Sequence, residues 1–474
     1  MPRIASTSIT TLTDSYKVTH WPQYPPGTEQ VYSYFEPRMG GMFDEIVFFG
    51  LQYFLLRYLE GKVLTIEDIK HGKELAALHF GNDKLFNATG WLSLLEKHEG
   101  RLPILIKAVP EGTVVPQSNV LMTIENTDNE FPWLTNWLET LLVQVWYPST
   151  VATLSREVKK IILHYLERTG DPKLIPFKLH DFGYRGSTSV ESAGLGGVAH
   201  LVNFMGTDTM RALEFAQTYY GTPMAGFSIP ASEHSTITSW GKGNESAAFA
   251  NMLAKYPDGL VACVSDSYDI YNAVANLWGT ELHKEVMGRN GTLVIRPDSG
   301  NPKEVIRKVC QMIWDKFGGT VNEKGFRVFD PHVRLIQGDG IKWISGDGDG
   351  YEPCHTVGEI LDDMMANGFS ADNIAFGSGG GLLQQMNRDT LRFAFKCSAI
   401  RQNGNWIDVY KNPVTQHGKI SKKGRLSLVK TENGRLHTVP YSEGANDMLV
   451  PVFLNGEMLV EDSLDAIRER ARVE

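Results

Sequence analysis

The sequence predicts an α/β protein made of an irregular (β/α) barrel and a second, mixed α+β domain built from the N-terminal and C-terminal segments. Between residues 151 and 385, seven short apolar runs alternate with helical patterns. They recur about every 25 to 40 residues, which is the length of one βα unit. The segments on either side, 1–150 and 386–474, lack this alternation. We therefore expect a catalytic barrel at 151–385.

The N-terminal segment carries signals of both strands and helices. Apolar β-rich runs indicate strands at residues 31–35, 104–109 and 120–124, and helical spacing indicates helices at 51–59 and 66–80. The apolar stretch 131–148 is interrupted by Thr135, Asn136 and Glu139. It therefore predicts a buried helix rather than a membrane span.

The apolar runs of the central segment predict parallel strands. They occupy residues 178–179, 201–204, 225–229, 260–264, 292–295, 333–336 and 374–376. This many strands over about 235 residues favour a barrel over an open doubly wound sheet. One helix start is marked by Asn301-Pro302, an N-cap residue followed by a proline in the first turn.

The C-terminal segment predicts antiparallel strands. Asn403-Gly404, Asn433-Gly434 and Asn455-Gly456 each separate two strand-like runs, which is the strongest short signal of a β-hairpin. We expect these strands to pack with the N-terminal segment and a terminal helix to begin at Ser463.

Composition excludes several classes of protein. The net charge of the 474 residues is −9, which argues against nucleic-acid binding, and no run of 18 apolar residues indicates a membrane protein. The N-terminus has no apolar core of signal-peptide length. The 4 cysteines include no CxxC pair, so neither a disulfide framework nor a zinc site is indicated. We expect a soluble protein of the cytoplasm.

Polar residues and glycines follow nearly every predicted strand of the barrel. They lie at 180–185, 206–208, 228–234, 265–267, 296–300, 337–340 and 377–381. One charged strand end is ordinarily a solvated cap, but the carboxyl ends of barrel strands share one rim, where ligands bind. The recurrence of such residues on strand after strand indicates a ligand site there.

Two features indicate a phosphate-containing ligand. The glycine run 377–381 follows a late strand, a position where backbone amides commonly bind phosphate in barrels, although a glycine cluster alone could be a turn. No GxxxxGK[ST] motif is present. The tail adds cations that suit a polyphosphate, although any one of them could lie on a solvated hairpin: Arg388, Lys396, Lys411, Lys419, Lys422, Lys423 and Arg425.

Motifs along nearly the whole chain carry a family resemblance. They lie at residues 13–20 (TDSYKVTH), 178–186, 206–209, 231–238 (ASEHSTIT), 265–271, 295–302, 336–340, 373–383 and 422–428. In this order they resemble the nicotinamide phosphoribosyltransferase family of type II phosphoribosyltransferases. The resemblance implies that nicotinamide and phosphoribosyl diphosphate give nicotinamide mononucleotide and diphosphate in NAD salvage. It also implies Mg²⁺ bound with the diphosphates, ATP use through a phosphohistidine, and a homodimer with its active sites at the interface.

The resemblance also implies roles for residues around the nicotinamide and the ribose. Phe182 would stack on the pyridine ring, with Tyr16 of the partner subunit on the opposite face. Asp208 would accept a hydrogen bond from the carboxamide, and Ser228 would also contact substrate. Arg296 and Asp298 would hold base and ribose, and with His234 they form the expected catalytic set. The ribose-phosphate pocket would be lined by Gly338, Asp339, Gly379 and Gly380.

The remaining implied roles concern phosphate groups. Arg185, Arg296 and His234 would lie beside the diphosphate, with His234 the phosphorylated residue. Arg388 and Lys396 of the partner subunit would reach the 5′-phosphate. Further polyphosphate contacts would come from Arg38, Lys411 and Lys419. Two departures from the family stand out: residues 341–355 are longer than expected, and Ala262 replaces an expected serine.

The chemistry suits these residue types. Loss of diphosphate from the anomeric carbon leaves negative charge that fixed cations stabilise, and the pyridine nitrogen is itself the nucleophile, so no strong base is needed. One alternative is a nicotinate phosphoribosyltransferase, which Asp208 disfavours because a carboxylate repels a carboxylate. A glycosidase-type barrel would show an acid pair without the glycine and lysine features. A non-enzymatic sugar-phosphate sensor is the third alternative.

Overall fold

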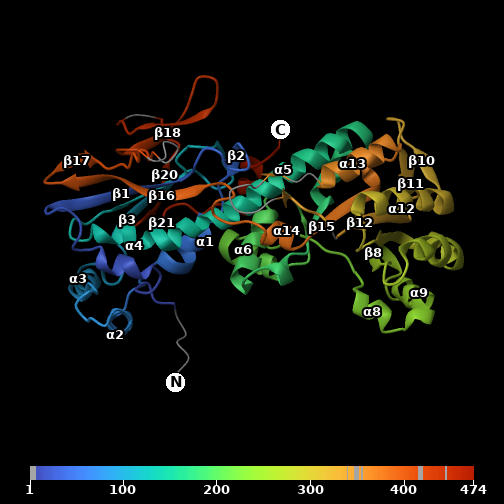
Figure 1. Cartoon of the computed structure of the whole chain (residues 1–474), viewed down its shortest axis with the longest axis horizontal. Coiled ribbons are helices and arrows are strands. Elements are labelled where there is room, and N and C mark those ends of the chain that lie inside the picture. The colour runs from blue at the N-terminus through green and yellow to red at the C-terminus, as the bar shows by residue number, and fades with distance from the viewer. Residues whose placement is uncertain are drawn as a thin grey trace. The chain divides into compact units, whose positions relative to one another are not determined.

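The structure, a computed structural model, describes residues 7–338, 340–345, 352–353, 356–414, 420–443 and 446–473 (Figure 1). Its internal contacts divide the chain into two compact units. The flanking unit comprises residues up to Thr153, residues 219–221 and residues 387–471, and the barrel unit comprises residues 154–218 and 222–386. Asp339 and Lys419, two residues with expected phosphate roles, lie outside the described residues.

The flanking unit is built on an antiparallel sheet to which both ends of the chain contribute. Its strands, in spatial order, are β17 (Asn405–Asp408), β16 (Phe393–Gln402), β1 (Thr28–Pro37), β5 (Met122–Asn126), β3 (Ile104–Ala108), β20 (Val450–Leu454) and β21 (Glu457–Met458). Two small ribbons pair β2 (Glu45–Val47) with β4 (Val114–Pro116) and β18 (Leu426–Lys430) with β19 (Leu436–Pro440). In Figure 1, β1, β16 and β17 lie side by side.

Helices of the flanking unit include the predicted ones. They are α1 (Leu51–Phe54) with a π-helical continuation (Leu55–Leu59), α2 (Ile66–Phe80), α3 (Ala88–His98), α4 (Trp133–Leu142), the first part of α5 (Trp146–Thr169), α15 (Leu464–Arg470), and short 3₁₀ turns at Ser15–Thr19 and Val143–Val145. Thr65 caps α2 through a capping box with Asp68, and Ser463 caps α15. Buried α4 confirms the prediction for the stretch 131–148.

The three Asn-Gly hairpins are confirmed. Asn403 and Gly404 take φ of 49° and 82°, and Asn455 and Gly456 take 50° and 85°, the left-handed values that a two-residue turn between twisted strands requires. Gly434, with φ of 82°, turns the chain between β18 and β19.

The barrel unit contains one parallel sheet of 6 strands. Their spatial order is β7 (Gly206–Thr207), β6 (Leu179–Asp181), β15 (Ile374–Ser378), β12 (Val333–Gln337), β9 (Asn290–Arg296) and β8 (Asp258–Val264). Two ribbons pair β10 (Gly319–Val321) with β11 (Arg327–Phe329) and β13 (Ile344–Ser345) with β14 (Glu352–Pro353).

Helices connect and cover these strands. They are the rest of α5, α6 (Val190–His200), α7 (Met210–Tyr220), α8 (His234–Thr238), α9 (Glu245–Lys255), α10 (Ile270–Asn272), α11 (His283–Met287), α12 (Pro302–Phe317), α13 (Thr356–Ala366) and α14 (Gly380–Leu383). A π-helix covers Ala273–Glu281, and 3₁₀ turns lie at Pro172–Phe177, Tyr184–Gly186, Lys242–Asn244 and Ala371–Asn373. As predicted, Asn301 caps α12 by accepting from the Glu304 amide. In the described part of the chain, no helix has the length and apolarity that crossing a bilayer demands.

Two of the predicted strands are wrong. Residues 201–204 form the turn that ends α6, with Leu201 and Phe204 buried, and the strand begins only at Gly206. Residues 225–229 form no strand but make a single parallel bridge between Phe227 and Gly206. An apolar run of this length can be buried in a core either as a turn or as a strand. The hydrophobic periodicity of the sequence therefore does not distinguish the two.

The chain from Phe227 to Ser232, which begins in the second of these wrongly predicted strands, forms hydrogen bonds with both edges of the parallel sheet. Thr207 N–H donates to Phe227 O at 3.0 Å on the β7 edge, and Ser232 N–H donates to Ala262 O at 3.0 Å on the β8 edge. One stretch of chain therefore bridges both edge strands of the parallel sheet. The predicted fold class, an irregular barrel with a second α+β unit, is confirmed.

Candidate functional site

The carboxyl ends of the barrel strands place an aromatic ring and a carboxylate close together. Phe182 follows β6, and Asp208 follows β7, its neighbour in the sheet. His180, on β6, contacts both residues: its ring centroid lies 5.0 Å from that of Phe182, and its Nε2 lies 2.8 Å from Oδ1 of Asp208. Ser228 donates its hydroxyl to the same carboxylate oxygen. The structure thus brings together three predicted residues, Phe182, Asp208 and Ser228.

Asp208 is held in its ionised form. Burial, the largest effect, raises the pKa of this carboxyl, but the hydrogen bond and charge of His180, the Ser228 hydroxyl and the charge of Arg296 together outweigh it. The pKa of Asp208 therefore lies below its ordinary value. Its side chain is still 43% exposed, so the carboxylate has capacity to accept a further hydrogen bond from a ligand.

The ring of Phe182 lies close to glycine backbone. A Cβ atom at Gly377 would lie 2.0 Å from Cε2 of Phe182, and one at Gly338 would lie 3.4 Å from it. Only glycine at 377 therefore lets the ring occupy this position. The Phe182 amide donates to Ser378 O at 2.9 Å, which fixes the backbone of the ring to β15.

An apolar cluster inside the barrel continues from this ring. Ala262, Val294 and Ile336, on β8, β9 and β12, are buried together, and the partly buried Phe182 and Ile229 pack against them. Ala262, Val294 and Ile336 lie on neighbouring parallel strands and share one face of the sheet. The arrangement offers an apolar surface for a flat ring, bordered by one carboxylate.

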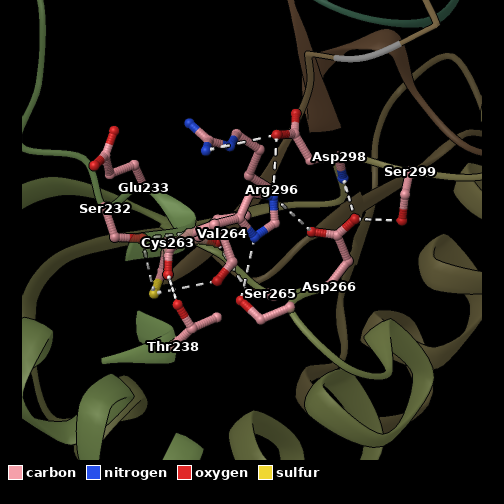
Figure 2. A network of polar contacts seen from close by, with 12 residues as sticks. Ser232, Glu233, Thr238, Cys263, Val264, Ser265, Asp266, Arg296, Asp298 and Ser299 are labelled. Carbon is pink, nitrogen blue, oxygen red and sulfur yellow. Dashed lines mark hydrogen bonds and ion pairs between the residues drawn. The ribbon is translucent and has the colours of Figure 1, made fainter. Parts of the chain in front are cut away.

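A charged group lies at the ends of β8 and β9. Figure 2 shows the guanidinium of Arg296 facing the carboxylate of Asp298, and the hydroxyl of Ser299 facing the carboxylate of Asp266. Asp266 accepts from the Asp298 amide at 3.0 Å and from the Ser299 hydroxyl. Arg296 Nη2 lies 3.8 Å from Asp298 Oδ2, and the buried Nε of Arg296 has no hydrogen-bond partner. A guanidinium whose buried Nε–H donor is unused is suited to bind an anionic or hydroxyl-bearing ligand.

His234 joins this charged group as the first residue of α8. Its Nε2 lies 3.5 Å from Oδ2 of Asp298 and 3.8 Å from Oδ1 of Asp266, while its Nδ1 lies 3.3 Å from the Ser267 hydroxyl. The imidazole side chain is 48% exposed, whereas Asp266 is 4% exposed. The structure therefore brings the predicted catalytic set of His234, Arg296 and Asp298 together.

The glycine run predicted to bind phosphate borders the same rim. A Cβ atom at Gly380 would meet no atom within 4 Å, and one at Gly379 only Phe182 O at 3.7 Å. The backbone is thus open to close approach. Arg185, in the 3₁₀ turn Tyr184–Gly186, is exposed, and a Cβ at Gly186 would lie 3.0 Å from Cα of Gly380. This contact brings the Arg185 turn against the glycine run.

The other predicted phosphate residues lie in the flanking unit. Burial, and then the nearby charges of Arg38, Arg388 and Lys411, lower the pKa of Lys396, although Glu139 acts in the opposite direction. Buried Nε and Nη2 of Arg38 have no hydrogen-bond partner. Four cations are therefore gathered without full neutralisation, as expected for an anion site. Tyr16, also in this unit, is 58% exposed.

Two residues of the site had no predicted role. His180 and Asp266 lie within strand-end motifs, but residue type alone does not show that each orients a neighbour that contacts ligand. Only their position could have indicated a role. His180 lies two residues before Phe182, and Asp266 follows β8, which pairs with the strand that precedes Asp298. Among the described residues, no group of three or more histidines, cysteines and carboxylates is arranged to hold a metal ion.

Comparisons with known proteins find family matches over most of the chain. The family model of the nicotinate phosphoribosyltransferase family matches residues 177–448, and that of the nicotinamide phosphoribosyltransferase N-terminal domain matches residues 8–106. A nicotinamide phosphoribosyltransferase of Xanthomonas campestris is 50% identical over 97% of both chains. One of Acinetobacter baylyi is 32% identical over 96% of this chain and 95% of its own.

Solved structures share the fold at low identity. Nicotinate-nucleotide pyrophosphorylase of Pyrococcus furiosus has a TM-score of 0.59 at 17% identity, covering 99% of this chain and 97% of its own. Human nicotinic acid phosphoribosyltransferase has a TM-score of 0.54 at 16% identity, covering 97% and 92%. The sequence matches confirm the resemblance predicted from the motifs. The chain therefore belongs to the nicotinate phosphoribosyltransferase family, and it is a phosphoribosyltransferase.

Proposed function

We propose that the enzyme transfers the phosphoribosyl group of phosphoribosyl diphosphate to nicotinamide, giving nicotinamide mononucleotide and diphosphate in NAD salvage. The observation that carries this proposal is the ionised Asp208 beside the Phe182 ring. A carboxylate accepts a hydrogen bond from the carboxamide NH₂ of nicotinamide, whereas it repels the carboxylate of nicotinate. The named relatives support the same base, because those of Xanthomonas and Acinetobacter are both nicotinamide phosphoribosyltransferases.

In this mechanism the pyridine nitrogen is the nucleophile. Phe182 stacks on the ring and Asp208 fixes the carboxamide, so the nitrogen is aimed at the anomeric carbon of the ribose. The bond from that carbon to diphosphate breaks with its electron pair on the leaving group, and the new C–N bond makes the pyridine cationic. No proton moves, which agrees with a site whose carboxylates are ion-paired or hydrogen-bonded rather than arranged as an acid–base pair.

Arg296 and Asp298 bind the ribose and the leaving group. Asp298 can accept from a ribose hydroxyl, and the unpartnered guanidinium Nε of Arg296 can donate to an oxygen of base or phosphate. Arg185 adds positive charge beside the glycine run. Preorganised cations of this kind stabilise negative charge as it develops on diphosphate.

The 5′-phosphate and polyphosphate groups require more cations than the rim supplies. The glycines Gly338, Gly379 and Gly380 leave backbone open to a phosphate, and Asp339 belongs to the same predicted pocket. We assign the four gathered cations of the flanking unit, Arg38, Arg388, Lys396 and Lys411, to phosphate groups. Lys419 is assigned the same role from the sequence alone. In the family arrangement, Arg388 and Lys396 of the partner subunit and Tyr16 of the partner subunit complete each site, which makes the enzyme a homodimer.

Mg²⁺ fits as the counter-ion of the diphosphate substrate. The described residues form no cage of three ligands, but Mg²⁺ commonly binds through one or two carboxylates plus substrate phosphates. Asp266 and Asp298 are the carboxylates that would hold it, since buried Oδ1 of Asp266 has no hydrogen-bond partner. When bound, the ion supplies positive charge to the departing diphosphate.

His234 is the residue through which ATP is used. A neutral imidazole can attack the γ-phosphorus of ATP, forming a P–N bond while ADP leaves, and water later releases phosphate. The ring is half-exposed and next to the carboxylates of Asp266 and Asp298, so a phosphoryl group on it would lie beside the diphosphate and its Mg²⁺. The expected cytoplasmic location agrees with the unpaired Cys263, Cys310 and Cys397.

One experiment tests the proposed reaction directly. The purified enzyme is incubated with Mg²⁺ and phosphoribosyl diphosphate and with nicotinamide or nicotinate, and the nucleotide product is identified by mass. We expect nicotinamide mononucleotide as the main product. Formation of nicotinate mononucleotide alone would favour the nicotinate reaction, and no product with either base would favour a sensor.

A further inference from the structure

Residues 341–343, at the start of the stretch that was expected to be longer than in the family, lie against the glycine run. After Gly340, the chain passes through Trp343 into a two-stranded ribbon in which β13 pairs with β14. Trp343 is 3% exposed, and its indole Nε1–H donates to the Ser378 hydroxyl at 2.8 Å. This is a buried side-chain contact between the segment after Gly340 and the last residue of β15, both of which border the proposed phosphate pocket.

Ser378 is the second residue of the glycine run 377–381. It ends β15, and its carbonyl accepts the Phe182 amide at 2.9 Å. The Trp343 side chain also packs against the run itself, since a Cβ at Gly381 would lie 3.5 Å from Cδ1 of Trp343 and 3.2 Å from Ile341 O. Residues 341–343 thus hold the glycine run at two points, by hydrogen bond and by packing.

We propose that Trp343 is a positioning residue for phosphoribosyl diphosphate. Glycines carry no side chains that pack, so a run of them loses more conformational freedom on becoming ordered than other residues do. A buried indole that is hydrogen-bonded to Ser378 orders the glycine run when the protein folds, so substrate binding does not have to order it. Trp343 itself touches no substrate, and it acts by keeping Gly379 and Gly380 in the geometry that admits a phosphate. The inference rests on the proposed phosphate role of these glycines.

A purely structural role makes a different prediction. If Trp343 only fills the core, its replacement lowers the melting temperature and leaves the KM for each substrate unchanged. If it positions the glycine run, loss of the N–H raises the KM for phosphoribosyl diphosphate more than the KM for nicotinamide. One neutral buried hydrogen bond corresponds to a change of about fivefold in an equilibrium constant.

The test uses Trp343→Phe, Ser378→Ala and the double variant of the full-length enzyme. Trp343→Phe keeps an aromatic ring but lacks the N–H, and Ser378→Ala removes the acceptor while keeping the carbonyl that holds Phe182. Trp137→Phe is the matched control, because Trp137 is also 3% exposed and its Nε1–H donates to Ile9 O at 3.0 Å in the flanking unit. KM and kcat for each substrate and the melting temperature are measured for all variants.

We expect each single variant to raise the KM for phosphoribosyl diphosphate about fivefold, and the double variant no further, because both remove one hydrogen bond. Trp137→Phe should lower only the melting temperature. An unchanged KM in Trp343→Phe, or effects that multiply in the double variant, would overturn the proposal. If Trp343→Phe fails to fold, an unchanged KM in Ser378→Ala overturns it equally. Failure of the proposed function is distinguished because it would appear in the wild-type enzyme, as no transfer to nicotinamide.

Discussion

Nε2 of His180 lies 2.8 Å from Oδ1 of Asp208, so the imidazole orients the carboxylate that borders the Phe182 ring. His180 lies within β6, and Asp208 directly follows β7, its parallel neighbour. This pair connects the barrel topology with base choice. The pairing of β6 with β7 sets the distance between His180 and Asp208. The hydrogen bond between these two side chains lowers the pKa of Asp208, whereas burial raises it.

A first prediction concerns pH. The folded-state pKa of Asp208 lies below its ordinary value of 3.8, so its carboxylate is present above that pH and is lost as the pH falls through the lowered pKa. In His180→Ala, burial remains while the compensating hydrogen bond is gone, so the pKa of Asp208 should rise. The acid limb of the kcat/KM profile for nicotinamide should therefore move to higher pH.

His180→Gln is the matched control, because its amide can still donate to Asp208. Its acid limb should lie between those of the wild type and His180→Ala when the kcat/KM profile is extended down to about pH 3, below the ordinary pKa of an aspartate. Superimposable profiles for the wild type and His180→Ala would remove His180 from this role.

The contact between Phe182 and Gly377 gives a second prediction. A Cβ at Gly377 would lie 2.0 Å from the ring, so Gly377→Ala must displace Phe182. We expect the KM for nicotinamide to rise roughly tenfold or more, as expected when about 1.4 kcal/mol of stacking is lost. Gly243→Ala is the control, since a Cβ there meets no atom within 4 Å and the backbone φ is not in the left-handed region. Equal KM values for the two variants would contradict the stacking role of Phe182.

How much of this could be predicted from the sequence depends on the kind of signal. Hairpins at Asn403-Gly404 and Asn455-Gly456, and the helix cap at Asn301, were predictable because local backbone geometry determines them. The strands predicted at 201–204 and 225–229 were wrong, because an apolar run indicates burial and does not distinguish a turn from a strand. The domain boundaries near residues 150 and 385 stay a prediction.

For the site, polar residues after the predicted strands indicated that Asp208, Arg296 and Asp298 share one rim, and the family resemblance supplied their expected roles and that of His234, which stay predictions. These signals could not reveal that Gly377 supports a ring or that Trp343 donates to Ser378, because both contacts join residues distant in sequence. Nor could they show that Asp266 holds the Asp298 amide, a role that depends on the pairing of β8 with β9.

Subunit sharing gives a third prediction. If Tyr16 of the partner subunit completes each site, Tyr16→Ala and Phe182→Ala homodimers should both be impaired. Mixing them should restore activity, because each mixed dimer holds one intact site and one doubly altered site. We expect up to about a quarter of wild-type activity, since half of the dimers are mixed at random exchange and half of their sites are intact. No recovery after confirmed exchange would contradict a shared site.

His234 gives a fourth prediction. ATP should lower the apparent KM of the wild-type enzyme for phosphoribosyl diphosphate, because a phosphohistidine adds acceptors beside the diphosphate and its Mg²⁺. His234→Ala should lose both ATP hydrolysis and this coupling while keeping slower basal transfer, since the pyridine nitrogen remains the nucleophile. ATP hydrolysis is followed as phosphate release. Continued hydrolysis by a folded His234→Ala dimer would exclude the phosphohistidine without affecting the transferase assignment.

The measurement that tests base choice by Asp208 most directly compares kcat/KM for nicotinamide and nicotinate in the wild type and in Asp208→Asn. The wild type should prefer nicotinamide. In Asp208→Asn the repulsion is gone and the amide can donate to a carboxylate, so the preference should fall by roughly 10- to 100-fold, the size expected for a hydrogen bond to a charged group. An unchanged ratio of the two kcat/KM values in Asp208→Asn would contradict the selection of nicotinamide by Asp208.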